Sequence, residues 1–169
     1  MSYTATATRT YTRTHTATHL SDVIMGSIAD ILGTLGIDAT RLFADWDTDQ
    51  RAISAWILEG SLKAVALECH QPGGVVNPIL EFPVSYGGGE EADRQFTADR
   101  AALARYLAKL QRVPSGTNYR LFCSFNGSHS DQAGWSPASR TSIAGMQSYT
   151  FGTLAAGPHA NASLRYYVK

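Results

Sequence analysis

The stretch that most constrains the fold is residues 119–125, with the sequence YRLFCSF. Apolar and aromatic residues occur there at neighbouring as well as alternate positions, which is typical of a β-strand covered on both faces. Such a strand needs neighbours, because an isolated strand satisfies neither its main chain nor its apolar side chains. The stretch therefore predicts a strand in the middle of a sheet, or one lying against a partner strand.

Two earlier segments have the period-two pattern of a hairpin. Residues 62–70 and 79–86 each place larger apolar side chains on one face, and Pro-Gly-Gly at 72–74 turns the chain between them. Pro83 has no N–H to donate to a neighbouring strand. Its strand is therefore predicted to be an edge strand, or to direct the proline nitrogen away from its partner.

Three helices are predicted, two before the hairpin and one between the hairpin and residues 119–125. Each begins at an N-cap side chain, has an apolar stripe of period 3.6, and ends at glycine or proline. The predicted limits are Ser21 to Gly36, Asp47 to Gly60, and Thr97 to Pro114. Together with the strands they predict an α+β fold, with one mainly antiparallel sheet and three helices packed on one face.

The first 18 residues have a different pattern. Every even position from Thr4 to Thr18 is threonine, and strict period two with β-branched residues predicts a strand. Neither face of this strand is strongly apolar. It is therefore expected to be an edge strand or a weakly anchored arm.

Residues 126–169 are rich in turn-forming residues but also in large apolar ones. A disordered tail would lack side chains such as Trp135, Tyr149 and Phe151, so the segment is expected to pack on the rest of the domain. One interpretation is a long functional loop, since loops of that length are rare in compact domains. The other is a run of short antiparallel strands and turns that completes the sheet.

Composition restricts the partners and the compartment. Fourteen basic and fourteen acidic residues give a formal net charge of zero, which does not favour direct nucleic-acid binding. Without an apolar run near 18 residues or a secretory signal, no membrane association is expected and the cytoplasm is predicted. Cys69 and Cys123 are interpreted as small buried hydrophobes, and no metal or cofactor is predicted.

No catalytic motif passes a spacing test. The sequence lacks Gly-x-Ser-x-Gly, His-Glu-x-x-His, Cys-x-x-Cys and a phosphate-binding glycine loop followed by Lys-Ser/Thr. Cys69 and His70 are neighbours on a predicted strand, so their side chains point to opposite faces. The chain is therefore predicted to be a binding protein and not an enzyme.

Four segments of the sequence together resemble the bacterial HORMA domain proteins of CBASS anti-phage operons. These are the threonine-alternating residues 3–18, residues 51–68 (RAISAWILEGSLKAVALE), residues 82–87 (FPVSYG) and residues 134–136 (GWS). The resemblance covers essentially the whole chain and implies one domain, 1–169. Its implied parts are an N-terminal strand or arm (1–18), a core (19–125) and a C-terminal safety belt (126–169).

In that family the safety belt closes around a short closure-motif peptide. The resemblance implies that the peptide adds to strand 119–125 by β-augmentation. The closed form then binds and activates a cGAS/DncV-like nucleotidyltransferase (CD-NTase), and an AAA+ ATPase reopens the HORMA protein.

The implied sites comprise two sets of residues. Those expected to hold the peptide are Leu121, Cys123, Phe125, Trp135, Tyr149 and Phe151, although the aromatic ones could equally fill the outer core of the sheet. Those expected to engage the ATPase are Thr4, Thr6, Thr8, Arg9 and Tyr11 in the N-terminal arm. The alternative from another class is a β-rich structural protein that oligomerises through its N-terminal strand.

Overall fold

A computed structural model describes residues 2–87 and 96–169, with side chains from residue 12 onward. Four helices and six strands follow one another in the described residues. They are α1 (Ser2–Leu35), α2 (Thr40–Ala44), α3 (Trp46–Glu59), β1 (Leu62–His70), β2 (Val76–Tyr86), β3 (Thr97–Ala98), α4 (Arg100–Leu107), β4 (Asn118–Phe125), β5 (Gln147–Ala156) and β6 (Ala160–Val168).

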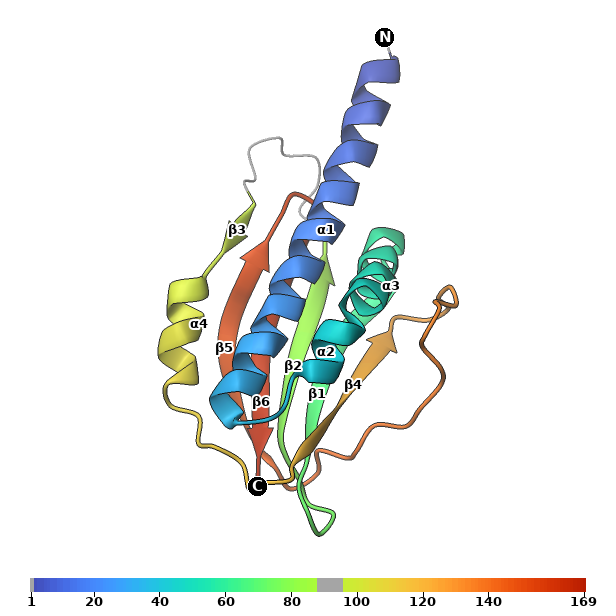
Figure 1. Ribbon diagram of the computed structural model, residues 1–169. Coiled ribbons are helices and arrows are strands. Elements are labelled where there is room, and N and C mark those ends of the chain that lie inside the picture. The colour runs from blue at the N-terminus through green and yellow to red at the C-terminus, as the bar shows by residue number, and fades with distance from the viewer. Residues whose placement is uncertain (1, 88–95) are drawn as a thin grey trace.

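The strands form one sheet with the order β3-β5-β6-β2-β1-β4, and each neighbouring pair is antiparallel. Helices α1, α2 and α3 lie across one face of this sheet, and α4 lies beside β5 (Figure 1). The α+β class, the antiparallel sheet and the helices packed on one face are confirmed. A short fourth helix, α2, was not predicted.

The core lies between this face and the helices. Val65, Leu67 and Cys69 alternate along β1 and join Phe82 of β2 in a cluster that is sealed by α1 and α3. Apolar side chains recur every second residue along the strands and about every 3.6 residues along the helices, so they lie on the surfaces of the sheet and helices that face each other. The hairpin of β1 and β2 is confirmed, with Leu67 opposite Leu80.

The strand predicted for residues 4–18 is wrong, because this part of the chain is the N-terminal portion of α1. Thr16, Ala17 and Leu20 are buried, so packing stabilises the helix against the weak helical propensity of threonine. The Thr18 hydroxyl donates to the Thr14 carbonyl at 3.0 Å within the helix. The N-terminal end of α1 extends beyond the sheet (Figure 1).

The predicted helix starts also need correction, whereas two of the predicted ends are confirmed. Ser21 does not cap α1 but donates to the Thr18 carbonyl inside it, and α3 begins at Trp46, ahead of Asp47. Thr97 belongs to β3, and Asp99 caps α4 by accepting from the Ala102 N–H. Glycines at the ends of α1 and α3 have φ of 80° and 78°, a conformation that glycine adopts without strain.

For two strands the structure excludes one of the two alternatives that the sequence left open. β2, which contains Pro83, lies between β6 and β1, so the edge-strand alternative is wrong. Strand β4 is at the edge of the sheet and not in its middle, and it pairs with β1 alone among the described strands. The second edge of β4 is therefore open to another partner.

Candidate functional site

The candidate site lies along this open edge of β4, where the chain leaves the sheet. Residues 126–146, here called the crossing segment, connect β4 at one edge to β5, with β1, β2 and β6 between them. The segment contains no described helix or strand and runs outside β4 before it reaches the end of the sheet where β5 begins (Figure 1). Both interpretations of residues 126–169 therefore apply in part, because β5 and β6 complete the sheet and the crossing segment is a long loop.

A cavity of about 290 Å³ separates β4 from the crossing segment. We call it the β4 slot. Leu121, Cys123 and Phe125 line it from β4, Trp135 and Pro137 line it from the crossing segment, and Trp56 of α3 contributes from the helix layer. Polar residues of the crossing segment, at positions 129–132 and 136, complete the lining, so the slot combines an unpaired strand edge with a wall that is partly apolar and partly polar.

Aromatic contacts hold the wall of the slot in place. The Trp56 ring packs edge-on against Phe125 and Trp135, with centroid distances of 4.8 and 5.5 Å. The His129 ring stacks on Phe125 at 3.6 Å, which covers the end of β4. These contacts join α3, β4 and the crossing segment around one buried indole.

Hydrogen bonds fix the first part of the crossing segment to α3. The Trp56 indole N–H donates to the Ser130 carbonyl at 2.8 Å, and Glu59 accepts from the Ser130 N–H at 2.9 Å and the Ser130 hydroxyl at 2.7 Å. Donation from the Ser61 hydroxyl and then from Ser130 holds the pKa of Glu59 below its usual value. Both the main-chain N–H and the main-chain carbonyl of Ser130 are therefore hydrogen-bonded to side chains of α3.

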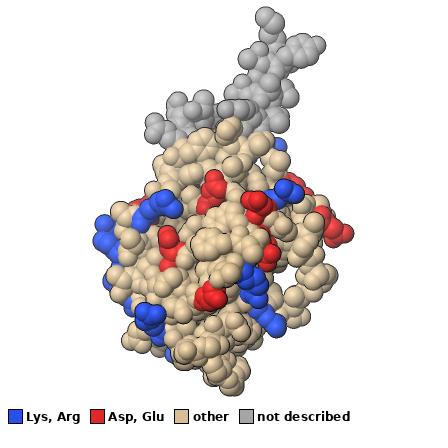
Figure 2. Space-filling view, in the orientation of Figure 1, with Lys and Arg blue, Asp and Glu red and all other residues tan. Residues whose placement is uncertain are grey.

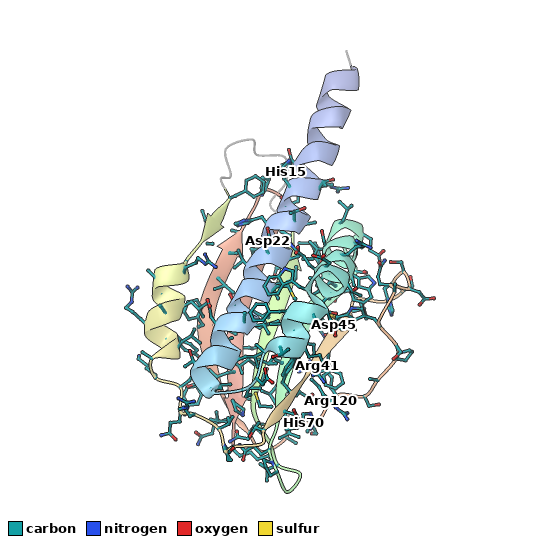
Figure 3. All side chains as sticks on the ribbon, in the orientation of Figure 1. His15, Asp22, Arg41, Asp45, His70 and Arg120 are labelled. Atoms are coloured by element: carbon teal, nitrogen blue, oxygen red, sulfur yellow. The ribbon has the colours of Figure 1, made fainter. Side chains whose placement is uncertain are left out.

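A smaller polar cavity of about 160 Å³ adjoins Trp135 and Leu121 on the side of α2 and α3. Arg41 donates to the Tyr119 carbonyl at 2.7 Å and lies 4.5 Å from the centre of the Tyr119 ring, close to Asp45 (Figure 3). Gly134 has φ of 85°, and a Cβ there would lie 2.7 Å from the Thr48 methyl carbon. The turn before Trp135 therefore requires glycine to approach α3 this closely.

Asp49 in this cavity has an altered acidity. Burial, and then the charge of Asp45, raises the pKa of Asp49 to about 6, whereas the charge of Arg41 favours the ionised form. Because the folded protein holds this proton more tightly than the unfolded chain, ionised Asp49 lowers stability above about pH 6, and the cost disappears as the pH falls toward about 4.

Replacing Asp49 with asparagine is expected to raise the free energy of unfolding by about 1 kcal/mol near neutral pH, a value reduced for the partial exposure of the side chain. The gain is expected to vanish below about pH 4, where the carboxyl is protonated in both states. Urea unfolding at the two pH values measures it. Asp47→Asn, an exposed carboxylate in the same helix, is the matched control, and an equal gain there would contradict the assignment to Asp49.

The two cysteines are free thiols on neighbouring strands. Cys69 lies opposite Tyr119 and Cys123 opposite Val65, so the two are offset along the sheet. Burial raises the pKa of Cys69 to about 12 and also raises the pKa of Cys123. Both are therefore protonated at neutral pH and present weakly polar, apolar-like surface, which in the case of Cys123 lines the slot.

The structure brings together four of the six residues predicted to hold a peptide. Leu121, Cys123, Phe125 and Trp135 line the β4 slot. Tyr149 and Phe151 lie instead on β5, separated from β4 by three strands. There Tyr149 stacks on Tyr166 at 4.9 Å and Phe151 packs edge-on against Tyr106 at 5.2 Å.

Sequence reasoning missed Trp56, His129 and Pro137 as slot residues. Trp56 follows the helical stripe of α3 and is interpreted as core from sequence alone, and no local pattern marks the other two. The residues predicted to engage an ATPase, Thr4, Thr6, Thr8, Arg9 and Tyr11, all lie in the N-terminal part of α1.

Two negative findings concern only residues 2–87 and 96–169. Within them no group of three or more His, Cys, Asp or Glu side chains is placed to hold a metal ion. No helix in the same residues is long and apolar enough to cross a membrane. On the face shown in Figure 2, basic and acidic side chains are interspersed, without a patch of one sign.

A family model described as bacterial HORMA domain 2 matches residues 5–169. The chain belongs to this HORMA family. The match includes α1 from its first turns, the sheet and the crossing segment. No curated protein sequence matches this HORMA domain.

Solved structures show the same fold at low sequence identity. A chain of the Mitotic Checkpoint Complex matches with a TM-score of 0.75 and 10% identity, covering 90% of this chain and 98% of that one. C. elegans HTP-1 bound to the HIM-3 closure motif matches with a TM-score of 0.67 and 12% identity, covering 88% of each chain. The E. coli MS115-1 HORMA:CdnC:Trip13 complex matches with a TM-score of 0.61 and 12% identity, covering 92% of this chain and 89% of that one. The HORMA fold is thereby confirmed.

Proposed function

We propose that this HORMA domain is a peptide sensor of anti-phage signalling. Residues 126–169 act as a safety belt that closes over a closure-motif peptide. The closed form binds and activates a cognate cGAS/DncV-like nucleotidyltransferase, and an AAA+ ATPase reopens it. The domain itself acts by binding, in the cytoplasm, and not by catalysis.

The observation that carries the proposal is the open edge of β4 facing the β4 slot. An edge strand offers a row of N–H and C=O groups, and an extended peptide satisfies them by adding as a further strand. Alternate side chains of that peptide would meet Leu121, Cys123 and Phe125 on one side and Trp135 on the other, all of which line the cavity. Tyr149 and Phe151 are not included, because β5 lies at a distance from this edge.

The path of the crossing segment supports a closing motion. A peptide in the slot would lie between β4 and the crossing segment, which is bound to α3 through Ser130. A peptide cannot enter beneath this continuous segment unless the segment is released. Binding is therefore coupled to opening and closing of residues 126–146, which suits a two-state sensor.

The partners are proposed from the related complexes. One protein with this fold, C. elegans HTP-1, is bound to the HIM-3 closure motif, and another is part of the E. coli HORMA:CdnC:Trip13 complex. The N-terminal part of α1, which extends past the sheet (Figure 1), is the segment that a remodelling ATPase could grasp, at Thr4, Thr6, Thr8, Arg9 and Tyr11. The alternative, oligomerisation through an N-terminal strand, is not supported, because the N-terminal residues form helix α1.

A peptide selection tests the proposal. Purified protein is expected to enrich, from a library of random linear peptides, sequences with apolar residues at alternate positions, and these peptides are expected to raise its melting temperature. Adding such a peptide together with a CdnC-type nucleotidyltransferase from the same genome is expected to start cyclic oligonucleotide synthesis. Selected peptides that bind a variant with a filled slot, Cys123→Trp, as tightly as the original protein would contradict the proposed site. Synthesis that is unaffected by the HORMA protein would contradict the proposed activation.

A further inference from the structure

The crossing segment has a second attachment, on the face of the sheet opposite the helices. Thr141 donates to Glu68 of β1 twice, from its N–H to Oε2 at 3.0 Å and from its hydroxyl to Oε1 at 2.8 Å. The neighbouring Arg140 donates to Glu81 Oε2 of β2 at 2.9 Å. Two successive residues of the segment are thus bound to two carboxylates of the central strands.

Both carboxylates are buried. Glu68 is 0% exposed and Glu81 is 6% exposed, which is rare for glutamate. On the sheet side, His70 lies 3.2 Å from Glu68 Oε1, and Arg165 of β6 donates to Glu81 Oε1 from Nε at 2.9 Å and from its terminal nitrogen at 2.6 Å. His70 is at the end of β1 near the hairpin turn (Figure 3).

The two carboxylates depend on the crossing segment to different degrees. Glu81 would retain Arg165 if Arg140 moved away, as long as β6 stays paired with β2. Glu68 would lose both of its Thr141 donors and keep only His70. A hydrogen bond to a charged acceptor is stronger than one between neutral groups, so Glu68 favours the arrangement in which Thr141 is in place.

We propose that Glu68 and Glu81 form a latch that holds the crossing segment closed whether or not a peptide is in the slot. Residues 140 and 141 are not among those that line the slot, so the latch acts on the segment without touching the peptide. Glu68 and Glu81 are therefore positioning residues, which set the fraction of molecules with a closed segment. The inference rests on the proposed function in one respect, that this fraction controls the apparent affinity for the peptide.

Hydrogen exchange of the full-length protein without peptide tests the latch. Thr141→Val keeps the shape of the side chain and the main-chain N–H but removes one donor to Glu68. Amides of residues 138–146 are expected to exchange at least about tenfold faster in this variant, because a hydrogen bond to a charged acceptor is lost. Amides of β1 and β2 are expected to exchange as in the original protein.

Two control variants separate the latch from general disturbance of the loop. Thr141→Ser restores the hydroxyl and is expected to restore protection. Ser142→Ala removes the neighbouring hydroxyl, which accepts a hydrogen bond from the Ala144 N–H at 3.2 Å, and is expected to leave exchange of residues 138–146 unchanged apart from that amide. Unchanged exchange in Thr141→Val, or an equal increase in β1 and β2, would overturn the latch.

Arg140→Ala supplies a second measurement that does not depend on Thr141 variants. It is expected to accelerate exchange of residues 138–146 while β6 stays protected, because Arg165 still pairs with Glu81. Accelerated exchange throughout β6 would contradict the separate roles of the two arginines. All these measurements omit the peptide, so failure to select any slot-binding peptide would refute the proposed function and leave the latch standing. Unchanged exchange in the latch variants would refute the latch and leave the proposed function standing.

Discussion

Replacing Trp135 with alanine is expected to weaken binding of a peptide selected on this protein by roughly 30- to 100-fold, or about 2 to 3 kcal/mol. The Trp135 ring lines the β4 slot and packs edge-on against the buried Trp56, so its position is fixed before a peptide arrives. Rigid aromatic side chains in such positions commonly dominate binding energy. Fluorescence anisotropy of a labelled peptide measures the affinity.

Tyr149→Ala is the matched control for this loss. Tyr149 is another large aromatic residue in the C-terminal part of the chain, but it is 46% exposed and stacks on Tyr166 on β5, away from the slot. The peptide is expected to bind this variant with unchanged affinity. If Tyr149→Ala weakened binding as much as Trp135→Ala, the peptide would lie on β5 and the assignment to the β4 edge would be incorrect.

Period-two and helical patterns predict the central layer of the fold well. The alternation in residues 62–70 predicts both limits of β1, because most side chains there, on both faces of the strand, are buried. The same patterns fail for the N-terminal threonines. Their alternation is a local strand preference, and burial of Thr16, Ala17 and Leu20 against the rest of the domain, which no local pattern encodes, favours the helix.

The candidate site was predicted in part, and long-range contacts explain the remainder. Alternate residues of strand 119–125 and Trp135 were assigned to peptide binding, and the structure places them around one cavity. The crossing segment itself is fixed by residues more than fifty positions away. Ser130 is bound to Trp56, Arg140 to Glu81, and Thr141 to Glu68, with separations of 74, 59 and 73 residues. A loop without secondary structure has no periodicity from which such partners follow.

The largest effect on stability is expected for Trp56→Ala, which should lower the free energy of unfolding by about 3 to 5 kcal/mol. Trp56 is 2% exposed and joins the core to Phe125, Trp135 and the Ser130 carbonyl. Its removal leaves a cavity between α3 and β4 and takes away the aromatic contacts and the indole hydrogen bond of the crossing segment, which remains attached through Glu59. Urea unfolding followed by far-UV circular dichroism measures the change independently of the lost indole.

Trp56→Phe separates packing from the hydrogen bond at the same position. Phenylalanine keeps most of the aromatic contact with Phe125 and Trp135 but leaves the Ser130 carbonyl without its indole donor, and a cost of about 1 to 2 kcal/mol is expected. Since Glu59 still binds the Ser130 N–H and hydroxyl, residue 130 should stay attached to α3 in this variant. If Trp56→Phe cost as much as Trp56→Ala, the indole hydrogen bond and not the aromatic packing would be the main attachment of the crossing segment.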